Sequence, residues 1–426
     1  MLLRASPLRD AAILFALWLM VFTSASQTII VTPILPLIGA ALRAPESHLG
    51  WLVTAYAWAL AASALVMGPV SDRVGRRRVL LLGAGTLTVV LALHGLARSF
   101  EAFLAVRLLA GAGGGMLSGA AVSFVGDYFP YEKRGKATGW VMSGIAFGLV
   151  LGIPLGRVLA AAFDFRVPFL AFSALMGVAF TLIFFLVPQP DVEREAEALS
   201  VVGALRRYAG LFERGPVRVA VAVYFLMFLS LGLFVTYLPQ WLTEHFSLEV
   251  SLFGKPLRPF GLPVDFIATL FTVGGLASVA AGPTAGALSD RVGRRPLILT
   301  SCTGLLLVTV AVTYLVTERW VAYVLYVAVM MLFAMRMTPL QALLTALVPA
   351  RLRGTLLSLA IAVGQVGTGL GASLAGQLYA HAGYRTTTFA SAAALLAMTL
   401  LVWWALPEPD GQAQEVAPVP APASVG

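Results

Sequence analysis

The chain has 426 residues, of which 59% are apolar and only 12% are charged, and its mean hydropathy is +0.89. A soluble globular protein carries about 25% charged residues, so this composition excludes a soluble enzyme, a disordered regulator and a chain with a large domain outside a membrane. The apolar runs lack period-two alternation, which favours membrane-spanning helices over a transmembrane barrel. The single cysteine, Cys302, allows no internal disulfide and no cysteine metal site.

Twelve apolar runs are long enough to cross a bilayer as helices. In chain order they lie near 11–36, 49–69, 79–97, 100–128, 137–160, 168–187, 218–242, 265–288, 296–316, 320–347, 355–380 and 387–406. The N-terminal tail and the loops after even-numbered runs hold 19 Lys and Arg residues, whereas the opposite loops hold seven. Positive charge collects on the cytoplasmic side, so we expect both termini there. A cleaved signal peptide is the alternative for the first run, but its removal would leave eleven helices.

The sequence contains an internal repeat. Segment 68–82 recurs as 286–300 with nine of 15 positions identical, and residues 130–152 share Pro, Arg and Gly positions with 349–371. We therefore predict two six-helix halves, 1–187 and 218–406, joined by a cytoplasmic linker, 188–217, and followed by a disordered tail, 407–426. An insertion near 247–263 follows the seventh run. Two similar halves that meet near the membrane midplane are typical of transporters.

Two loops that follow even-numbered runs carry the same charged motif. Its residues are Gly68, Asp72, Arg73, Gly75 and Arg76 in the first loop, and Gly286, Asp290, Arg291, Gly293 and Arg294 in the second. With this motif in both halves, the sequence resembles the major facilitator superfamily over nearly its whole length. The resemblance implies that Asp72, Arg73 and Arg76 form a gate latch. The alternative is a positively charged membrane anchor without a gating role.

The fourth run carries Arg107 followed by small residues, which is similar to the helix-4 motif of the same family. A charge inside hydrocarbon costs at least about 2.5 kcal/mol, which favours a functional role for Arg107 over an arginine held only by backbone carbonyls. The resemblance implies that this role is proton coupling. Because no Asp or Glu lies deep in any of the twelve runs, however, coupling through a central carboxylate is not supported.

The fifth run carries a glycine row that resembles the helix-5 motif of drug and sugar efflux antiporters. The matching residues are Gly148, Gly152, Pro154 and Gly156, with Ile153 separating the usual Gly-Pro pair. Glycines at four-residue spacing share one helix face and let another helix approach closely. The resemblance favours export over uptake, and ordinary small-residue packing is the alternative.

The tenth run contains a second buried cation. Arg336 lies about 20 Å of helix before Pro349, so it must face a cavity or a partner. Methionines on both sides of it suit variable apolar ligands; the alternative for Arg336 is a structural tie to helix-end carbonyls. We predict a coupling and substrate path that includes Arg107, Gln27, Arg336, Tyr237, Trp241 and Gln341.

The sequence thus predicts an all-α membrane protein of the major facilitator fold, with twelve transmembrane helices in two pseudo-symmetric halves. We expect a multi-pass, monomeric transporter of the inner membrane that works by alternating access and exports a lipophilic neutral, anionic or zwitterionic small molecule, with proton antiport implied by the resemblance. The first alternative is a proton-coupled uptake symporter for a metabolite anion. The second is a non-transporting membrane sensor or chaperone. Besides substrate, proton and bilayer, we expect no partner, nucleic acid, cofactor, metal or enzymatic activity.

Overall fold

The computed structural model describes residues 7–189, 201–252, 255–256, 258, 263–348 and 352–405. Twelve helical spans in these residues are long and apolar enough to cross a membrane, which confirms the predicted fold class. The tail 407–426 and most of the linker between 188 and 200 lie outside the described residues. The first apolar run differs from its expected extent, because its helix ends at Ile29 and a second helix starts at Val31.

The first six spans pack together as one bundle, which we call the N-terminal bundle. Its elements are α1 (Pro7–Ile29), α2 (Val31–Leu42), α3 (Glu46–Val74), α4 (Arg76–Leu93), η1 (His94–Leu96), α5 (Phe100–Leu117), α6 (Ala120–Tyr128), α7 (Tyr131–Phe147), η2 (Gly148–Gly152), α8 (Ile153–Ala162) and α9 (Val167–Leu186). Three of its spans are composite: α4 and η1 form the third, α5 and α6 form the fourth, and α7, η2 and α8 form the fifth.

The last six spans form the C-terminal bundle. A short helix, α10 (Val201–Phe212), precedes it and contacts both α3 and α16. The bundle consists of α11 (Gly215–Val235), α12 (Leu238–His245), α13 (Phe266–Val292), α14 (Arg294–Leu315), α15 (Arg319–Ala346), α16 (Arg353–Ala382) and α17 (Tyr384–Ala405). Between α12 and α13, in the predicted insertion, β1 (Ser251–Leu252) pairs antiparallel with β2 (Lys255–Pro256).

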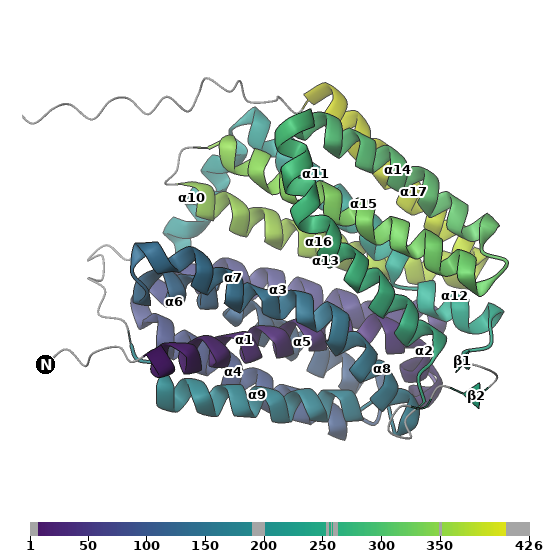
Figure 1. Ribbon diagram of the computed structural model, residues 1–426, viewed down its shortest axis with the longest axis horizontal. Helices are drawn as coiled ribbons and strands as arrows, with labels where there is room; N and C mark the ends of the chain where they lie inside the picture. The colour runs from purple at the N-terminus through teal and green to yellow at the C-terminus, as the bar shows by residue number, and fades with distance from the viewer. Residues whose placement is uncertain are drawn as a thin grey trace, which may run out of the picture.

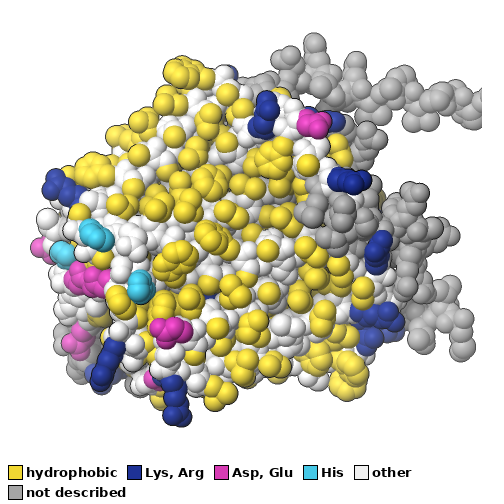
Figure 2. Space-filling model, turned by 180° about the vertical axis from the view of Figure 1, so that it is seen from behind, with side chains coloured by type: hydrophobic (Ala, Val, Ile, Leu, Met, Phe, Trp, Pro, Cys, Tyr) yellow, Lys and Arg dark blue, Asp and Glu magenta, His cyan; other side chains and the backbone are white. Residues whose placement is uncertain are grey.

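The two bundles lie side by side with their helices running lengthwise (Figure 1). We call the end where α1 begins and α17 ends the tail side, and the end that carries α2, α12 and the β1–β2 hairpin the far side. The bundles touch mainly where α3 packs on α16, with further contacts between α8 and α13 and between α2 and α12. Hydrophobic side chains cover the visible middle of the molecule, and charged side chains lie toward its two ends (Figure 2).

The glycine row of the fifth span packs against α1. A Cβ at Gly152 would lie 2.5 Å from the Cβ of Ser26, and one at Gly144 would lie 2.9 Å from the carbonyl oxygen of Trp18. Only glycine allows this separation, because the backbone of α1 occupies the space that a side chain would need. The row includes the π-helical turn Gly148–Gly152, whose Leu149 also contacts Gly275 of α13.

Candidate functional site

The two motif loops have the same backbone geometry. Gly75 ends α3 with φ 101°, and Gly293 ends α13 with φ 97°. Side chains other than glycine rarely adopt this region, so both glycines are required for the turn into the next helix. The side chains of Asp72 and Asp290 lie outside the described part of the structure. The latch role of Asp72 therefore stays a prediction.

Arg76 of the first loop holds an acidic residue of the fourth span. Its Nε donates to Oδ2 of Asp127 at 2.8 Å, and Nη1 donates to the hydroxyl of Ser71 at 3.0 Å. At the repeat offset of 219 the second half carries Ala346 in place of Asp127. The acidic partner of this loop is thus present in the first half alone, although the loop itself is repeated.

The next arginine of each loop binds the end of a helix, and here the two halves agree. Arg77 donates from Nη2 to the carbonyl oxygen of Phe184 at the end of α9, at 2.6 Å. Arg295, its repeat equivalent, donates to the carbonyl oxygens of Val402 and Trp403 at the end of α17. A cation at a helix C-terminus satisfies free carbonyls and the helix dipole, so these two residues anchor the loops to neighbouring helices.

Arg107 lies inside the N-terminal bundle, in a polar cluster that we call the Arg107 cluster. It is 1% exposed. Its Nη1 donates to Oε1 of Gln27 and its Nε to the carbonyl oxygen of Leu52, both at 3.4 Å. The guanidinium carbon lies 4.2 Å from the ring centre of Tyr56. Among the described residues no carboxylate forms an ion pair with it.

Tyr56 closes this cluster by joining α3 to α1. Its hydroxyl accepts from Nε2 of Gln27 at 2.9 Å and lies 2.6 Å from the hydroxyl of Thr28. The structure therefore brings together Arg107 and Gln27, two members of the predicted path. Tyr56 and Thr28 were missed, because nothing in their spacing links a residue of the second span to one of the first.

Arg336 lies in a different place. It is 1% exposed, and its Nη1 lies 3.7 Å from Sδ of Met398 in α17. Its guanidinium carbon lies 5.1 Å from the ring centre of Phe333, and its Nε has no partner in the described residues. These contacts place the guanidinium within the C-terminal bundle, away from the Arg107 cluster. Its role in the substrate path stays a prediction.

The other predicted path residues also separate. Tyr237 lies between the bundles on the far side, where its hydroxyl accepts from the backbone N–H of Gly50 at 2.9 Å and donates to the carbonyl oxygen of Glu46. Gln341 is exposed on α15. Trp241 lines a small apolar cavity of the C-terminal bundle.

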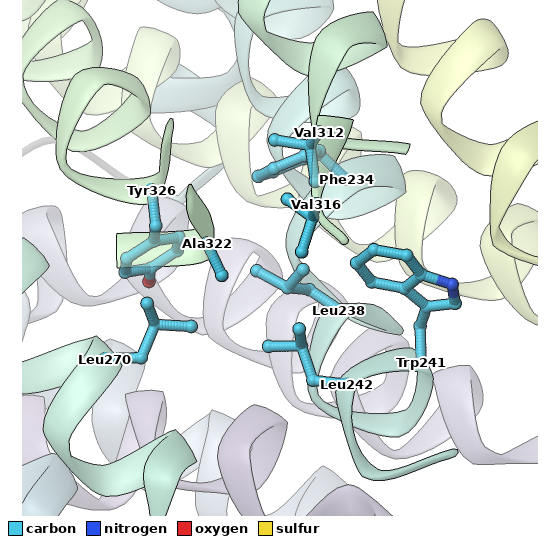
Figure 3. Close-up of a pocket in the computed structure, with 9 residues that line it drawn as sticks. All are labelled: Phe234, Leu238, Trp241, Leu242, Leu270, Val312, Val316, Ala322 and Tyr326. Carbon is cyan, nitrogen blue, oxygen red and sulfur yellow. The ribbon is translucent and has the colours of Figure 1, made fainter. Parts of the chain in front are cut away.

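That cavity is small and lies beside α12. Leu238, Trp241 and Leu242 of α12 face it from one side, and Ala322 and Tyr326 of α15 from the other (Figure 3). Phe234, Leu270, Val312 and Val316 complete its lining. Helix α12 thus lines the cavity, and Tyr237 at its start contacts the N-terminal bundle.

The far-side seam, which we define as the contacts of α3 with α16, α2 with α12 and α8 with α13, holds the two bundles together. In it, Thr54 of α3 donates to the carbonyl oxygen of Gly369 at 2.6 Å, and Trp58 donates to that of Val366 at 3.1 Å. The bundles are therefore closed against each other at the far side.

The seam also contains a buried ion pair that the sequence did not predict. Nε of Arg157 donates to Oδ2 of Asp265 at 2.6 Å, and Nη1 donates to the carbonyl oxygen of Pro33 at 2.8 Å. Arg157 was recognisable as a charge within the fifth span, and Asp265 as a residue at the mouth of the eighth. Their pairing depends on how the bundles dock, for which a single sequence carries no signal.

Known proteins resemble this chain along most of its length. The profile of the Major Facilitator Superfamily matches residues 17–257 and 256–425. The uncharacterized MFS-type transporter YceJ of Bacillus subtilis is 28% identical over 249 residues, 58% of this chain and 63% of that protein, so the match spans less than two thirds of this relative. The multidrug resistance protein MdtG of Proteus mirabilis is 24% identical over 399 residues, 92% of this chain and 94% of that protein.

Two solved structures share the fold. The crystal structure of a D-xylose-proton symporter superposes with a TM-score of 0.75 at 17% identity, covering 93% of this chain and 98% of that one. The human organic anion transporter MFSD10 gives a TM-score of 0.65 at 18% identity, covering 93% and 100%. With twelve spans, a repeated charged loop and a family profile that covers most of its length, the chain belongs to the major facilitator superfamily and is a multi-pass membrane transporter of small molecules rather than an enzyme.

Proposed function

We propose that this transporter exports lipophilic neutral, anionic or zwitterionic molecules. The observation that carries the proposal is the Arg107 cluster, a buried cation surrounded by neutral hydrogen-bonding groups, with no ion-pair partner in the described residues. A fixed positive charge at low dielectric repels cations and attracts anions much more strongly than it would in water. The match to a protein named for multidrug resistance supports export of apolar compounds.

The proposed orientation in the membrane rests on the charge asymmetry of the loops. If the tail side is cytoplasmic, as the positive-inside rule predicts, the far-side seam is a gate that is closed toward the outside. Substrate would then enter from the cytoplasm or the inner leaflet and leave on the far side after the seam opens. The inner membrane as location, cytoplasmic termini and a monomeric state belong to this proposal.

Proton antiport is the coupling mode that we propose. Asp127 is the acid best placed for it, because its side chain is 25% exposed near the tail side and already holds Arg76. Protonation of Asp127 would weaken its contact with Arg76 and loosen that tie between the motif loop and the fourth span. The resemblance to drug:proton antiporters supports this mode, and the absence of acids deep in the spans limits proton exchange to the ends of the helices.

Uptake of a metabolite anion together with protons is the second candidate. It is favoured by the same buried cation, since an unpaired guanidinium also suits a carboxylate or phosphate substrate. Drug sensitivity of a deletion strain supports export, whereas loss of growth on one organic acid supports uptake.

Purified protein should be tested by thermal shift against anionic, zwitterionic, neutral and cationic amphiphiles, because a ligand stabilises the state that binds it. We expect anionic and neutral compounds to raise the melting temperature. Arg107→Gln should weaken anion binding by about tenfold to a hundredfold, from about 1.5–3 kcal/mol for a lost charge-assisted contact, and leave neutral ligands nearly unaffected. Preferential stabilisation by cations would refute the proposed substrate class.

A further inference from the structure

Asp265 and Arg157 belong to different bundles, and their ion pair lies across the far-side seam. Arg157 extends from α8, three turns beyond the start of the glycine row, and is 1% exposed. Asp265 is the N-cap of α13, and its side chain is 12% exposed. The other two ion pairs of the described ranges, Arg76–Asp127 and Arg166–Asp164, each lie within the N-terminal bundle. The seam pair is thus well placed to report whether the bundles are docked.

Each partner is also held within its own bundle. Arg157 donates to the carbonyl oxygen of Pro33 in α2, and Asp265 accepts from the backbone N–H of Ala268 at 2.8 Å through its other carboxylate oxygen. These two contacts do not cross the seam, so they can persist when the bundles separate. They fix both side chains in the orientation that the ion pair needs, which lowers the conformational entropy lost when the pair re-forms.

We propose that Arg157 and Asp265 are the positioning pair that holds the far side of the transporter shut. In the closed state the two buried charges neutralise each other. Opening of the seam would expose both to far-side water, which replaces the lost pairing by hydration. Removing one partner alone leaves the other charge buried without compensation, and this penalty exists only while the seam is closed.

Removing one charge of the pair should shift the equilibrium between closed and open seam more than removing both charges. Asp265→Asn keeps the N-cap, since Asn caps helices as well as Asp does, but leaves the Arg157 cation buried without its counter-charge. It should shift the equilibrium toward the far-side-open state by about tenfold or more, the factor that corresponds to 1.4 kcal/mol. The double variant Arg157→Gln/Asp265→Asn removes both charges and should shift it less than Asp265→Asn alone. A pair that contributed only local stability would instead give additive losses of melting temperature.

The test measures the two gates without any substrate. Cys302→Ala removes the single native cysteine and allows spin labels at Ala41 and His381, exposed at the far-side ends of α2 and α16. A second labelled pair, Lys133 and Arg214, reports the tail side. In Asp265→Asn, double electron–electron resonance should show longer far-side and shorter tail-side distances than in the parent.

Asp164→Asn is the matched control, because it breaks a far-side ion pair that lies within one bundle and should leave both distance distributions unchanged. The inference depends on the proposed alternation between two facing states, so Gly50→Ala, a steric wedge in the seam, serves as the positive control. Unchanged distances in a folded Asp265→Asn variant, while Gly50→Ala opens the far side, would refute the role of the pair alone. Unchanged distances in both would count against alternation itself. If Asp265→Asn fails to fold, Arg157→Lys, which cannot reach both Asp265 and Pro33, should give a smaller shift of the same sign.

Discussion

Gly50 lies at the closest approach of the two bundles and can be used to force them apart. A Cβ at this position would lie against the carbonyl oxygen of Ala372 in α16 and 2.7 Å from its carbonyl carbon. Both are backbone atoms, which cannot rotate away as a side chain would. Gly50→Ala should therefore destabilise the closed seam. It should have little effect on a state in which α3 and α16 have separated.

The size of the effect follows from this overlap. One extra methyl group in a tightly packed contact costs about 1–3 kcal/mol, and each 1.4 kcal/mol changes an equilibrium constant tenfold. We expect the far-side-open population to rise by about fivefold to a hundredfold relative to the closed one. The open state avoids the overlap and stays available to the folded protein. The melting temperature should therefore fall by less than it would if every folded state carried the cost of about 1–3 kcal/mol.

Gly111→Ala is the control for this prediction. Its Cβ would meet the carbonyl oxygen of Tyr56 and lie 2.9 Å from the carbonyl carbon, an almost identical overlap that lies within the N-terminal bundle. It should lower the melting temperature without moving the far-side spin-label distance between positions 41 and 381. If Gly50→Ala behaves in the same way, with a lower melting temperature and an unchanged distance, then the α3–α16 contact is not part of a gate.

Three other outcomes are expected. Asp72→Asn should leave the protein folded and inserted but strongly reduce transport in proteoliposomes, and full transport by a well-expressed variant would remove the latch role. Asp127→Asn should keep a hydrogen bond to Arg76 but lose the negative charge, which weakens the contact by about 1 kcal/mol. Transport by this variant should respond less to a pH gradient, and an unchanged response would exclude Asp127 as a coupling acid. Arg336→Met should raise the melting temperature, because an apolar side chain then replaces a buried cation that has no ion-pair partner in the described residues. A lower melting temperature, together with a large loss of affinity for anionic ligands, would instead support the predicted substrate-path role.

The fold could be predicted from the sequence because the bilayer restricts it so strongly. Only helices satisfy their own backbone in hydrocarbon, so twelve apolar runs of the right length leave one type of architecture, and the repeated loops give its division into similar parts. The closing glycines of those loops were predictable for the same reason, since a tight turn at Gly75 and Gly293 requires a positive φ. For the helices and for these glycines, the bilayer and the local backbone geometry were sufficient for the prediction.

The candidate site was less accessible to prediction because it is made of contacts between distant spans. Arg107 could be recognised by its charge alone, and Gln27 by its polarity within an apolar run. The aromatic face of Tyr56 that covers Arg107 looks in the sequence like any tyrosine of a membrane helix. The pairing of Arg157 with Asp265 depends on the docking of two bundles, and no fixed spacing in the sequence encodes that docking.

Arg107 and Arg336, which form no ion pair with any described residue, also show how far the halves have diverged. At the repeat offset of 219, the position of Arg107 in the second half is Tyr326, and the position of Arg336 in the first half is Leu117. Tyr326 lines the apolar cavity beside α12, where Arg107 has its polar cluster in the other bundle. The fourth span and its repeat equivalent, the tenth, therefore each bury a cation, but at different positions along the helix. The charged loop is thus kept in both halves, whereas the buried charged and polar side chains of the spans are not.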